Sequence, residues 1–176
     1  MDFRRVLDTL AGFFEREQLR FAVVGAFGIA AYGRPRATAD LDVATGADGQ
    51  GRLIAFLDSL GYETLHASEG FSNHLHRDPE LGRVDVIYVA GDTARQLFDG
   101  CRPLLRLGER AIPVPRPEHL AAMKVHAMKN EPSRTLQELA DIRFLLTVPG
   151  VDAAEVRGYF ERAGLGERFD DLRRLG

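Results

Sequence analysis

The chain has 176 residues, of which 45% are hydrophobic and 28% are charged, and its formal net charge is −3. This length and hydrophobic content suit one domain, or a compact core with a helical appendage. The small net charge excludes a general attraction to nucleic acid or to an anionic membrane, so an RNA contact would need a local patch. The single cysteine, Cys101, excludes an internal disulfide and fits a reducing compartment.

The sequence also shows no signal of export or membrane insertion. No charged-then-apolar leader opens it, and no apolar run approaches the roughly 18 residues that a membrane-spanning helix needs. We therefore expect a cytoplasmic protein that does not enter the membrane.

Short strands are predicted to alternate with helices in the first two thirds of the chain. Helices are predicted by apolar spacing at residues 2–18, 26–32, 50–60 and 92–99. Strands are predicted by β-forming runs at 21–24, 40–43, 62–67, 73–77 and 83–89, with a hairpin at 104–114. From Arg116 onward only helices are predicted, at 117–130, 133–147, 152–163 and 166–175. N-caps are expected at Asp2, Asp92, Ser133 and Asp152.

These elements predict an α+β fold in two parts. A mixed α/β sheet flanked by helices is expected over residues 1–115, and a C-terminal helical bundle packed on it over residues 116–176. No linker is long enough to separate the two parts.

The stretch from Val23 to Val43 carries the clearest chemistry. A buried strand leads into a glycine turn at Gly25, and a basic loop then leads into a strand that begins Asp-Leu-Asp-Val. Because side chains alternate along a strand, Asp40 and Asp42 are expected on one face. Two neighbouring carboxylates repel each other unless a cation lies between them, and Mg²⁺ is the usual cation for such oxygen ligands.

This pattern resembles the signature of the DNA polymerase β-type nucleotidyltransferase superfamily. In that signature a glycine is followed by Gly or Ser and, about ten to a dozen residues later, by Asp-hydrophobic-Asp-hydrophobic. The segment from Gly33 to Asp42 is especially similar to the AbiEii-toxin-like branch and to the antibiotic nucleotidyltransferases. Ala26 departs from the pattern, because it stands where Ser or Gly usually helps to hold a phosphate.

The resemblance implies a nucleotidyltransferase-like fold and Mg²⁺-dependent transfer of NMP from an NTP. It implies a third metal-binding acid on a later strand, for which Asp85 is the best match. Backbone amides at Gly25 and Ala26 would hold the triphosphate, and Arg36 and Thr38 would contribute to nucleotide binding. The alternatives are that the acids lie at an edge or on the surface, and that Arg36 is a solvated loop residue.

Two residues of the helical part complete the expected site. Lys124 lies in the middle of an apolar helix face, so either its stem reaches solvent or its ammonium contacts an internal anion. The segment from Pro117 to Lys124 resembles a Pro-Glu-x-Leu-x-x-x-Lys helix of AbiEii-like enzymes, which implies a triphosphate partner for the lysine. The same family implies a catalytic role for Asp141.

Helical geometry points the other way for Asp141. It places this acid nearly opposite a predicted buried stripe made of Leu136, Leu139, Ile142 and Leu146. A solvated surface position is therefore the alternative to the catalytic role.

Other interpretations stay open at this point. The acceptor implied by the AbiEii-like branch is tRNA or protein, and the chain would then be the toxin of a pair with an antitoxin protein. A small-molecule antibiotic is the other acceptor class, and a catalytically weakened nucleotide-binding or partner-binding module is the alternative that Ala26 favours. His74, His76 and Asp78 have a spacing that would allow a zinc site, although on a strand such spacing is also typical of a solvated face.

Overall fold

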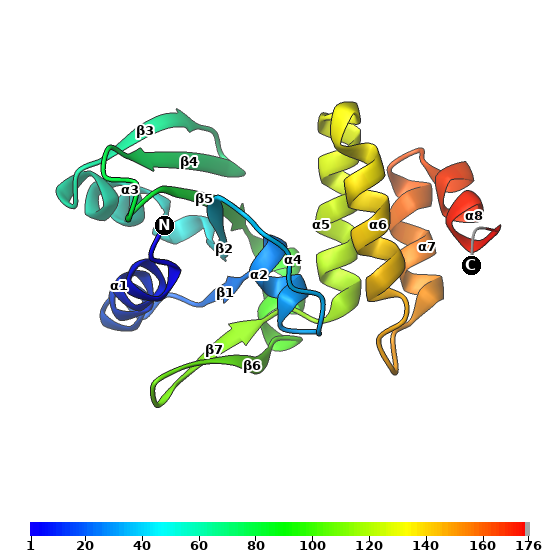
Figure 1. Cartoon of the computed structure of the whole chain (residues 1–176), viewed down its shortest axis with the longest axis horizontal. Coiled ribbons are helices and arrows are strands. Elements are labelled where there is room, and N and C mark those ends of the chain that lie inside the picture. Colours follow the sequence, from blue (N-terminus) through cyan, green and yellow to red (C-terminus); the bar gives the residue numbers. More distant parts are fainter. Residues whose placement is uncertain (175–176) are drawn as a thin grey trace. The chain divides into compact units, whose positions relative to one another are not determined.

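The protein is described by a computed structural model, which covers residues 1–174 and is drawn in Figure 1. Its contacts divide it into two compact units. The α/β unit comprises Met1–Ala31 and Pro35–Pro115, and the helical unit comprises Tyr32–Arg34 and the residues from Arg116 onward. The short segment Tyr32–Arg34 therefore belongs with the helices, although it lies within residues 1–115.

A five-stranded mixed sheet forms the centre of the α/β unit, in the order β1-β2-β5-β4-β3. Its strands are β1 (Phe21–Val23), β2 (Asp40–Gly46), β3 (Tyr62–Ala67), β4 (Phe71–His76) and β5 (Arg83–Val89). β2 and β5 are parallel, and the other neighbouring pairs are antiparallel. The predicted α+β class is confirmed.

Four helices and a hairpin complete this unit. The helices are α1 (Phe3–Arg16), α2 (Gly25–Ala30), α3 (Gln50–Ser59) and α4 (Gly91–Asp99), with a 3₁₀ turn, η1 (Ala47–Gly49), before α3. The hairpin is formed by β6 (Arg102–Leu107) and β7 (Arg110–Val114). Asp2 caps α1 by accepting a hydrogen bond from the amide of Arg5, as predicted. Asp92 lies inside the first turn of α4, whose N-cap is Ala90, so its predicted capping role is wrong.

Alternation along the strands separates a core face from a polar face. Leu41 and Val43 on β2, and Val84 and Val86 on β5, are buried in the hydrophobic core together with residues of α1 and α3. The intervening positions of β2 carry Asp40 and Asp42, which are only partly buried. This pattern confirms the prediction that the two acids share one face of the strand.

The helical unit contains four α-helices within the described residues. They are α5 (Pro117–Asn130), α6 (Thr135–Leu145), α7 (Ala153–Arg162) and α8 (Gly166–Arg174), with a 3₁₀ turn, η2 (Pro132–Arg134), before α6. Asp152 caps α7 as predicted. Ser133 lies in η2 and does not cap α6, because the 3₁₀ turn moves the start of that helix to Thr135. Leu175, the predicted end of the last helix, lies outside the described residues.

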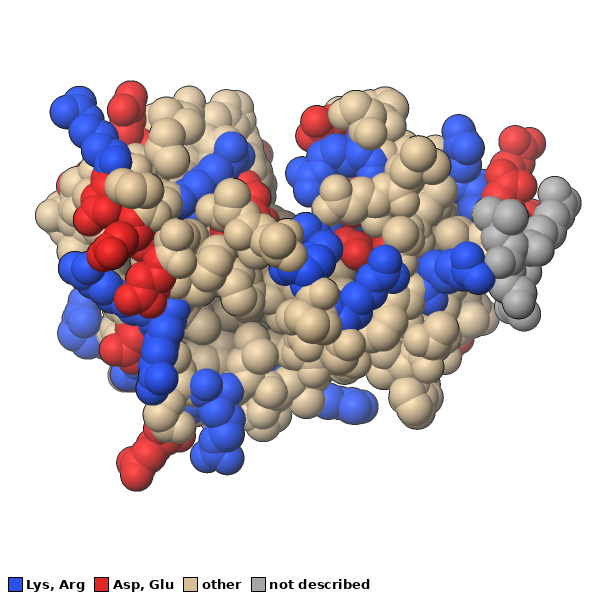
Figure 2. Space-filling model, in the orientation of Figure 1, with Lys and Arg blue, Asp and Glu red and all other residues tan. Residues whose placement is uncertain are grey.

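Charged side chains of both signs share the surface of the α/β unit. On the face shown in Figure 2, Lys and Arg side chains lie interspersed with Asp and Glu. Within residues 1–174, no helix is both long and apolar enough to span a membrane.

His74 lies inside the α/β unit with both ring nitrogens engaged. Its Nδ1 lies 3.0 Å from the Thr64 hydroxyl and its Nε2 lies 2.7 Å from the Ser72 hydroxyl. The Ser72 hydroxyl also lies 2.8 Å from the Tyr88 hydroxyl. His74 therefore belongs to a buried hydrogen-bond chain. Among the described residues, the group that is suited to a metal ion does not include His74, His76 or Asp78.

Burial of His74 predicts a loss of stability in acid. Desolvation lowers the pKa of His74 below its ordinary value of 6.5, although the charges of Asp58 and Asp85 partly oppose this shift. The unfolded chain therefore binds a proton that the folded chain resists, and stability falls as the pH falls below about 6.5. His74→Gln should lower stability at neutral pH and flatten its decline between about pH 7 and about pH 5.

Urea unfolding midpoints measured across this range check the prediction. His126→Gln, which changes an exposed histidine, should keep the wild-type pH dependence. An equally steep decline in the His74 variant would contradict the assignment.

Candidate functional site

The turn between β1 and α2 fits closely around the side chain of Asp42. The amide of Val24 donates a hydrogen bond of 3.0 Å to the carbonyl oxygen of Asp42. Gly25 follows with a φ of 57°, and a Cβ added there would lie 1.9 Å from Oδ2 of Asp42. Only glycine both adopts this backbone conformation easily and leaves room for the carboxylate. The first glycine of the sequence pattern therefore makes space for a predicted metal ligand.

Three carboxylates converge where β2 and β5 begin. The parallel register pairs Asp42 with Asp85, and Asp40 lies two residues before Asp42 on β2. Each of the three acids offers one oxygen, and these oxygens lie within 4.8 Å of one another. We call this group the acid triad. Asp85 is buried, whereas Asp40 and Asp42 are partly exposed, so the triad has an open side.

The donor set of the acid triad fits a divalent cation. Carboxylate oxygens are hard ligands that suit Mg²⁺, and the mutual repulsion of three such groups is relieved by a cation among them. Glycine at position 25 preserves the space beside Asp42 that a side chain would fill. The structure thus brings together the three acids that were predicted to bind metal; metal binding itself remains a prediction.

Two neighbouring residues orient the triad. The Thr38 hydroxyl donates a hydrogen bond to Oδ1 of Asp40. Arg83 donates two hydrogen bonds to Asp85, from Nε to Oδ1 at 2.7 Å and from Nη2 to Oδ2 at 3.1 Å. The hydrogen bond to Asp85 is the main cause that raises the pKa of Arg83, and the charges of Asp85, Asp40 and Asp42 add to it. Sequence reasoning missed Arg83, although its position two residues before Asp85 on a strand already implies a shared face.

A cavity of about 530 Å³ adjoins the triad at Asp40. Basic side chains from β4, β5 and the turn between them contribute to its lining, namely His76, Arg77 and Arg83. Among the described residues, Asp40 is the acid that lines it. Arg77 and Arg83 contribute positive charge to the lining, and Arg83 is paired with Asp85.

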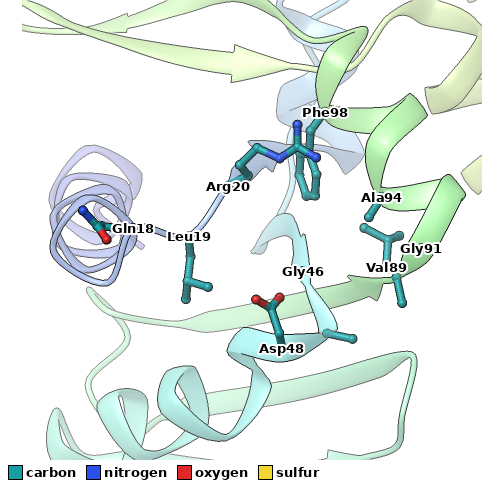
Figure 3. A pocket seen from close by; sticks show the side chains of 11 residues that line it. Gln18, Leu19, Arg20, Gly46, Asp48, Val89, Gly91, Ala94 and Phe98 are labelled. Carbon is teal, nitrogen blue, oxygen red and sulfur yellow. The ribbon is translucent and has the colours of Figure 1, made fainter.

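A second cavity, of about 410 Å³, lies at the other ends of β2 and β5 (Figure 3). There the Arg20 guanidinium lies over the Phe98 ring, 5.0 Å from its centroid, and pairs with Asp99 at 2.6 Å. Asp48 lines the same cavity from the turn after β2. Since β2 starts at Asp40 and ends at Gly46, this cavity is separated from the triad by the length of the strand.

In the helical unit, Lys124 has an internal anionic partner, one of the two alternatives left open by the sequence. Its ammonium lies 2.7 Å from Glu138 and 3.2 Å from Asp141, both on α6. The side chain of Lys124 is 9% exposed, and those of Glu138 and Asp141 are 0% and 2% exposed. Arg134 lies 3.1 Å from Glu138 and adds a second positive charge to this buried group.

The predicted buried stripe of α6 is right at Ile142 and wrong at Leu136, which is 84% exposed. The other buried residues of α6 are Glu138, Asp141 and Leu145, so the solvated alternative for Asp141 is wrong. A helical wheel that weighs only hydrophobicity places Asp141 outward, whereas the ion pairs with Lys124 hold both acids inside. The sequence missed Glu138 for the same reason; its spacing of three residues from Asp141 was the available signal.

Comparisons with known proteins identify the fold. In sequence, no protein-family model and no curated protein matches the chain. In structure, the antibiotic-resistance factor ANT(2'')-Ia is similar with a TM-score of 0.70 at 17% identity, over 99% of this chain and 98% of its own. The lincosamide antibiotic adenylyltransferase LnuA, bound to lincomycin, is similar with a TM-score of 0.59 at 16% identity, over 82% and 96%. The chain has a nucleotidyltransferase fold.

A third solved structure has a similar fold. The antigenic nucleotidyltransferase-like protein from Paracoccidioides brasiliensis is similar with a TM-score of 0.58 at 15% identity, over 96% of this chain and 92% of its own. At these identities the likeness concerns the nucleotidyltransferase fold. The more specific AbiEii-like branch has no support from it.

The remaining predicted nucleotide contacts lie near the triad in sequence. Ala26 is buried in the first turn of α2 and only 2% exposed, so its side chain faces the core. Arg36 lies in the loop before β2, where its Nη1 donates a hydrogen bond of 3.5 Å to the carbonyl oxygen of Ala37. The roles of Ala26, Arg36 and Thr38 in nucleotide binding stay predictions.

Gly25→Ala tests the close approach to Asp42. The added Cβ overlaps the carboxylate, so the variant should shift Asp42 and weaken Mn²⁺ binding at the triad by at least about tenfold. Gly91→Ala is a matched control, because Gly91 has nearly the same φ of 55° and no atom within 4 Å of an added Cβ. Gly91→Ala should lower the unfolding free energy by about 1 kcal/mol, because alanine must adopt the left-handed backbone conformation, and it should leave Mn²⁺ binding unchanged. Equal Mn²⁺ binding in the two variants would contradict the account.

Lys124→Met tests the buried charge group. It leaves two buried acids without the lysine between them, so the unfolding free energy should fall by about 3–5 kcal/mol. Replacing Glu138 by Gln and Asp141 by Asn in the same chain should recover most of that loss, since the buried charges are then removed together. Chemical denaturation measures both effects; a small loss in the single variant would show that the lysine is dispensable to the helical unit.

Proposed function

We propose that the protein is an Mg²⁺-dependent nucleotidyltransferase, which transfers NMP from an NTP to an acceptor hydroxyl and releases pyrophosphate. The observation that carries this proposal is the acid triad beside a glycine turn, on a nucleotidyltransferase fold. The structural neighbours support adenylyl transfer as the type of chemistry, since LnuA is an adenylyltransferase.

The residues have distinct roles in this proposal. Asp40 and Asp42 would hold the metal ion, with Asp85 completing the site. A bound Mg²⁺ supplies charge neutralisation at the phosphates and alignment of the attacking and leaving oxygens. Thr38 keeps the Asp40 carboxylate oriented through its hydroxyl hydrogen bond. Asp85 faces Arg83 in a two-point ion pair, and in this proposal it acts as a metal ligand or accepts the proton that leaves the attacking hydroxyl.

Backbone amides supply the expected triphosphate contacts. The N-cap of α2, Val24, makes no side-chain capping bond, so the amides near Gly25 and Ala26 have no side-chain cap. Such amides attract phosphate oxygens. The family-based expectation that Lys124 and Asp141 meet the substrates stays a prediction; within the helical unit these two residues pair with each other.

The acceptor that we favour is tRNA or protein, with the chain as the toxin of a toxin–antitoxin pair. The cavity beside Asp40 supports an acceptor that carries phosphate, because His76, Arg77 and Arg83 contribute to its lining. Arg77 in this lining would be a partner for a phosphate of such an acceptor.

A small-molecule antibiotic is the second candidate acceptor. It is favoured by the likeness to the antibiotic-resistance factor ANT(2'')-Ia and to LnuA, which was determined with lincomycin bound. A module that binds nucleotide without turnover is the third candidate, and it is favoured by Ala26, which lacks the hydroxyl of a serine.

Transfer of label separates these candidates. The protein is incubated with each α-labelled NTP, Mg²⁺ and total tRNA, a protein extract, or a panel that contains lincomycin and tobramycin. We expect label on tRNA, and Asp42→Asn should reduce it by at least about a hundredfold, because the variant lacks a metal ligand. Asp48→Asn removes an exposed acid at the other end of β2 and should leave the transfer unchanged.

Each outcome decides between the candidates. Label on an antibiotic alone would establish the second candidate. NTP binding that requires metal, with no labelled acceptor, would favour the binding module. No metal-dependent NTP binding at all would refute the proposed function.

A further inference from the structure

Two acids of the triad, Asp40 and Asp85, have partners of different charge. Asp40 accepts a hydrogen bond from a neutral hydroxyl, that of Thr38. Asp85 instead faces the guanidinium of Arg83 along both carboxylate oxygens, at 2.7 and 3.1 Å. This two-point pairing of guanidinium with carboxylate is stronger and more directional than a single contact. One acid of the triad is therefore already occupied by a cation that belongs to the chain itself.

The surroundings of the pair reinforce this occupancy. The Asp85 side chain is 12% exposed, so water competes little for its oxygens. Arg83 also lies beside Asp40 in the parallel register of β2 and β5.

We propose that Arg83 is a positioning residue that limits the triad to one divalent ion, at Asp40 and Asp42, in the absence of nucleotide. The guanidinium covers the side of Asp85 from which a second ion would bind, and its charge repels that ion. This inference rests on the proposed function and specifies how its metal site is regulated. It gives Arg83 a role that differs from simple support of the strand, because removal of the residue increases metal binding.

Mn²⁺ binding to the full chain without nucleotide tests the proposal. Free Mn²⁺ is followed by its electron paramagnetic resonance signal during titration, so the readout is independent of activity. The wild type should bind one ion, with affinity lowered by Asp42→Asn. Arg83→Gln should bind a second ion, or bind the first at least about tenfold more tightly, because a positive charge a few ångströms away has been removed.

Matched variants separate local from general effects. Arg95→Gln removes the same charge from an exposed pair with Asp92 on α4, and it should bind Mn²⁺ as the wild type does. Combining Arg83→Gln with Asp85→Asn should return binding to one ion of ordinary affinity, because the freed carboxylate is lost as well. Arg83→Lys keeps the charge but not the two-point geometry, and its affinity should lie between those of wild type and Arg83→Gln.

The outcomes distinguish this inference from the function on which it rests. If Asp42→Asn weakens Mn²⁺ binding but Arg83→Gln leaves it unchanged or weakens it, the role of Arg83 is wrong and the metal site stands. If Asp42→Asn binds Mn²⁺ as tightly as the wild type does, the proposed metal site is wrong, and the inference about Arg83 is wrong with it. If Arg83→Gln does not fold by circular dichroism, the Arg83→Lys titration decides, and affinity at or below wild type overturns the proposal.

Discussion

Electrostatic repulsion among three carboxylates is the constraint on which the site depends. Asp40, Asp42 and Asp85 offer oxygens within 4.8 Å of one another, an arrangement that costs free energy unless positive charge lies nearby. Arg83 and the Thr38 hydroxyl offset part of this repulsion by contacting Asp85 and Asp40. Asp40 and Asp42 lie partly exposed on one face of β2, which suits a cation from solution.

The backbone around the acid triad also accommodates these carboxylates. A side chain at position 25 would collide with Asp42, so the turn from β1 into α2 requires glycine there. The parallel pairing of β2 with β5 then brings Asp85 into register with Asp42. The helical unit handles buried charge differently, because Lys124 pairs with Glu138 and Asp141 in the interior and the exposed Arg134 pairs with Glu138 from outside. There the charges are balanced within the chain.

Much of this could be predicted from sequence because it depends on local periodicity. The bounds of β3, β5 and α5 were predicted as residues 62–67, 83–89 and 117–130, since alternation or helical spacing continues up to clear turn residues. The shared face of Asp40 and Asp42 follows from the same rule. Burial of Asp141 could not be predicted in this way, because it depends on Lys124 of another helix. Arg83 was missed because an arginine on a strand is ordinarily a solvent-facing residue, and its partner is known only once the charge of the triad is considered.

The central claim is that the acid triad binds a divalent metal ion together with a nucleotide. Crystals grown with Mn²⁺ and a non-hydrolysable ATP analogue test it directly, because manganese gives an anomalous signal that locates the ion independently of any assumed chemistry. The account predicts an anomalous peak within coordination distance of Asp40 and Asp42, bridged to phosphate oxygens of the analogue. A bound analogue whose manganese lies away from these carboxylates, or a triad that stays free of manganese at saturating concentration, would contradict the account.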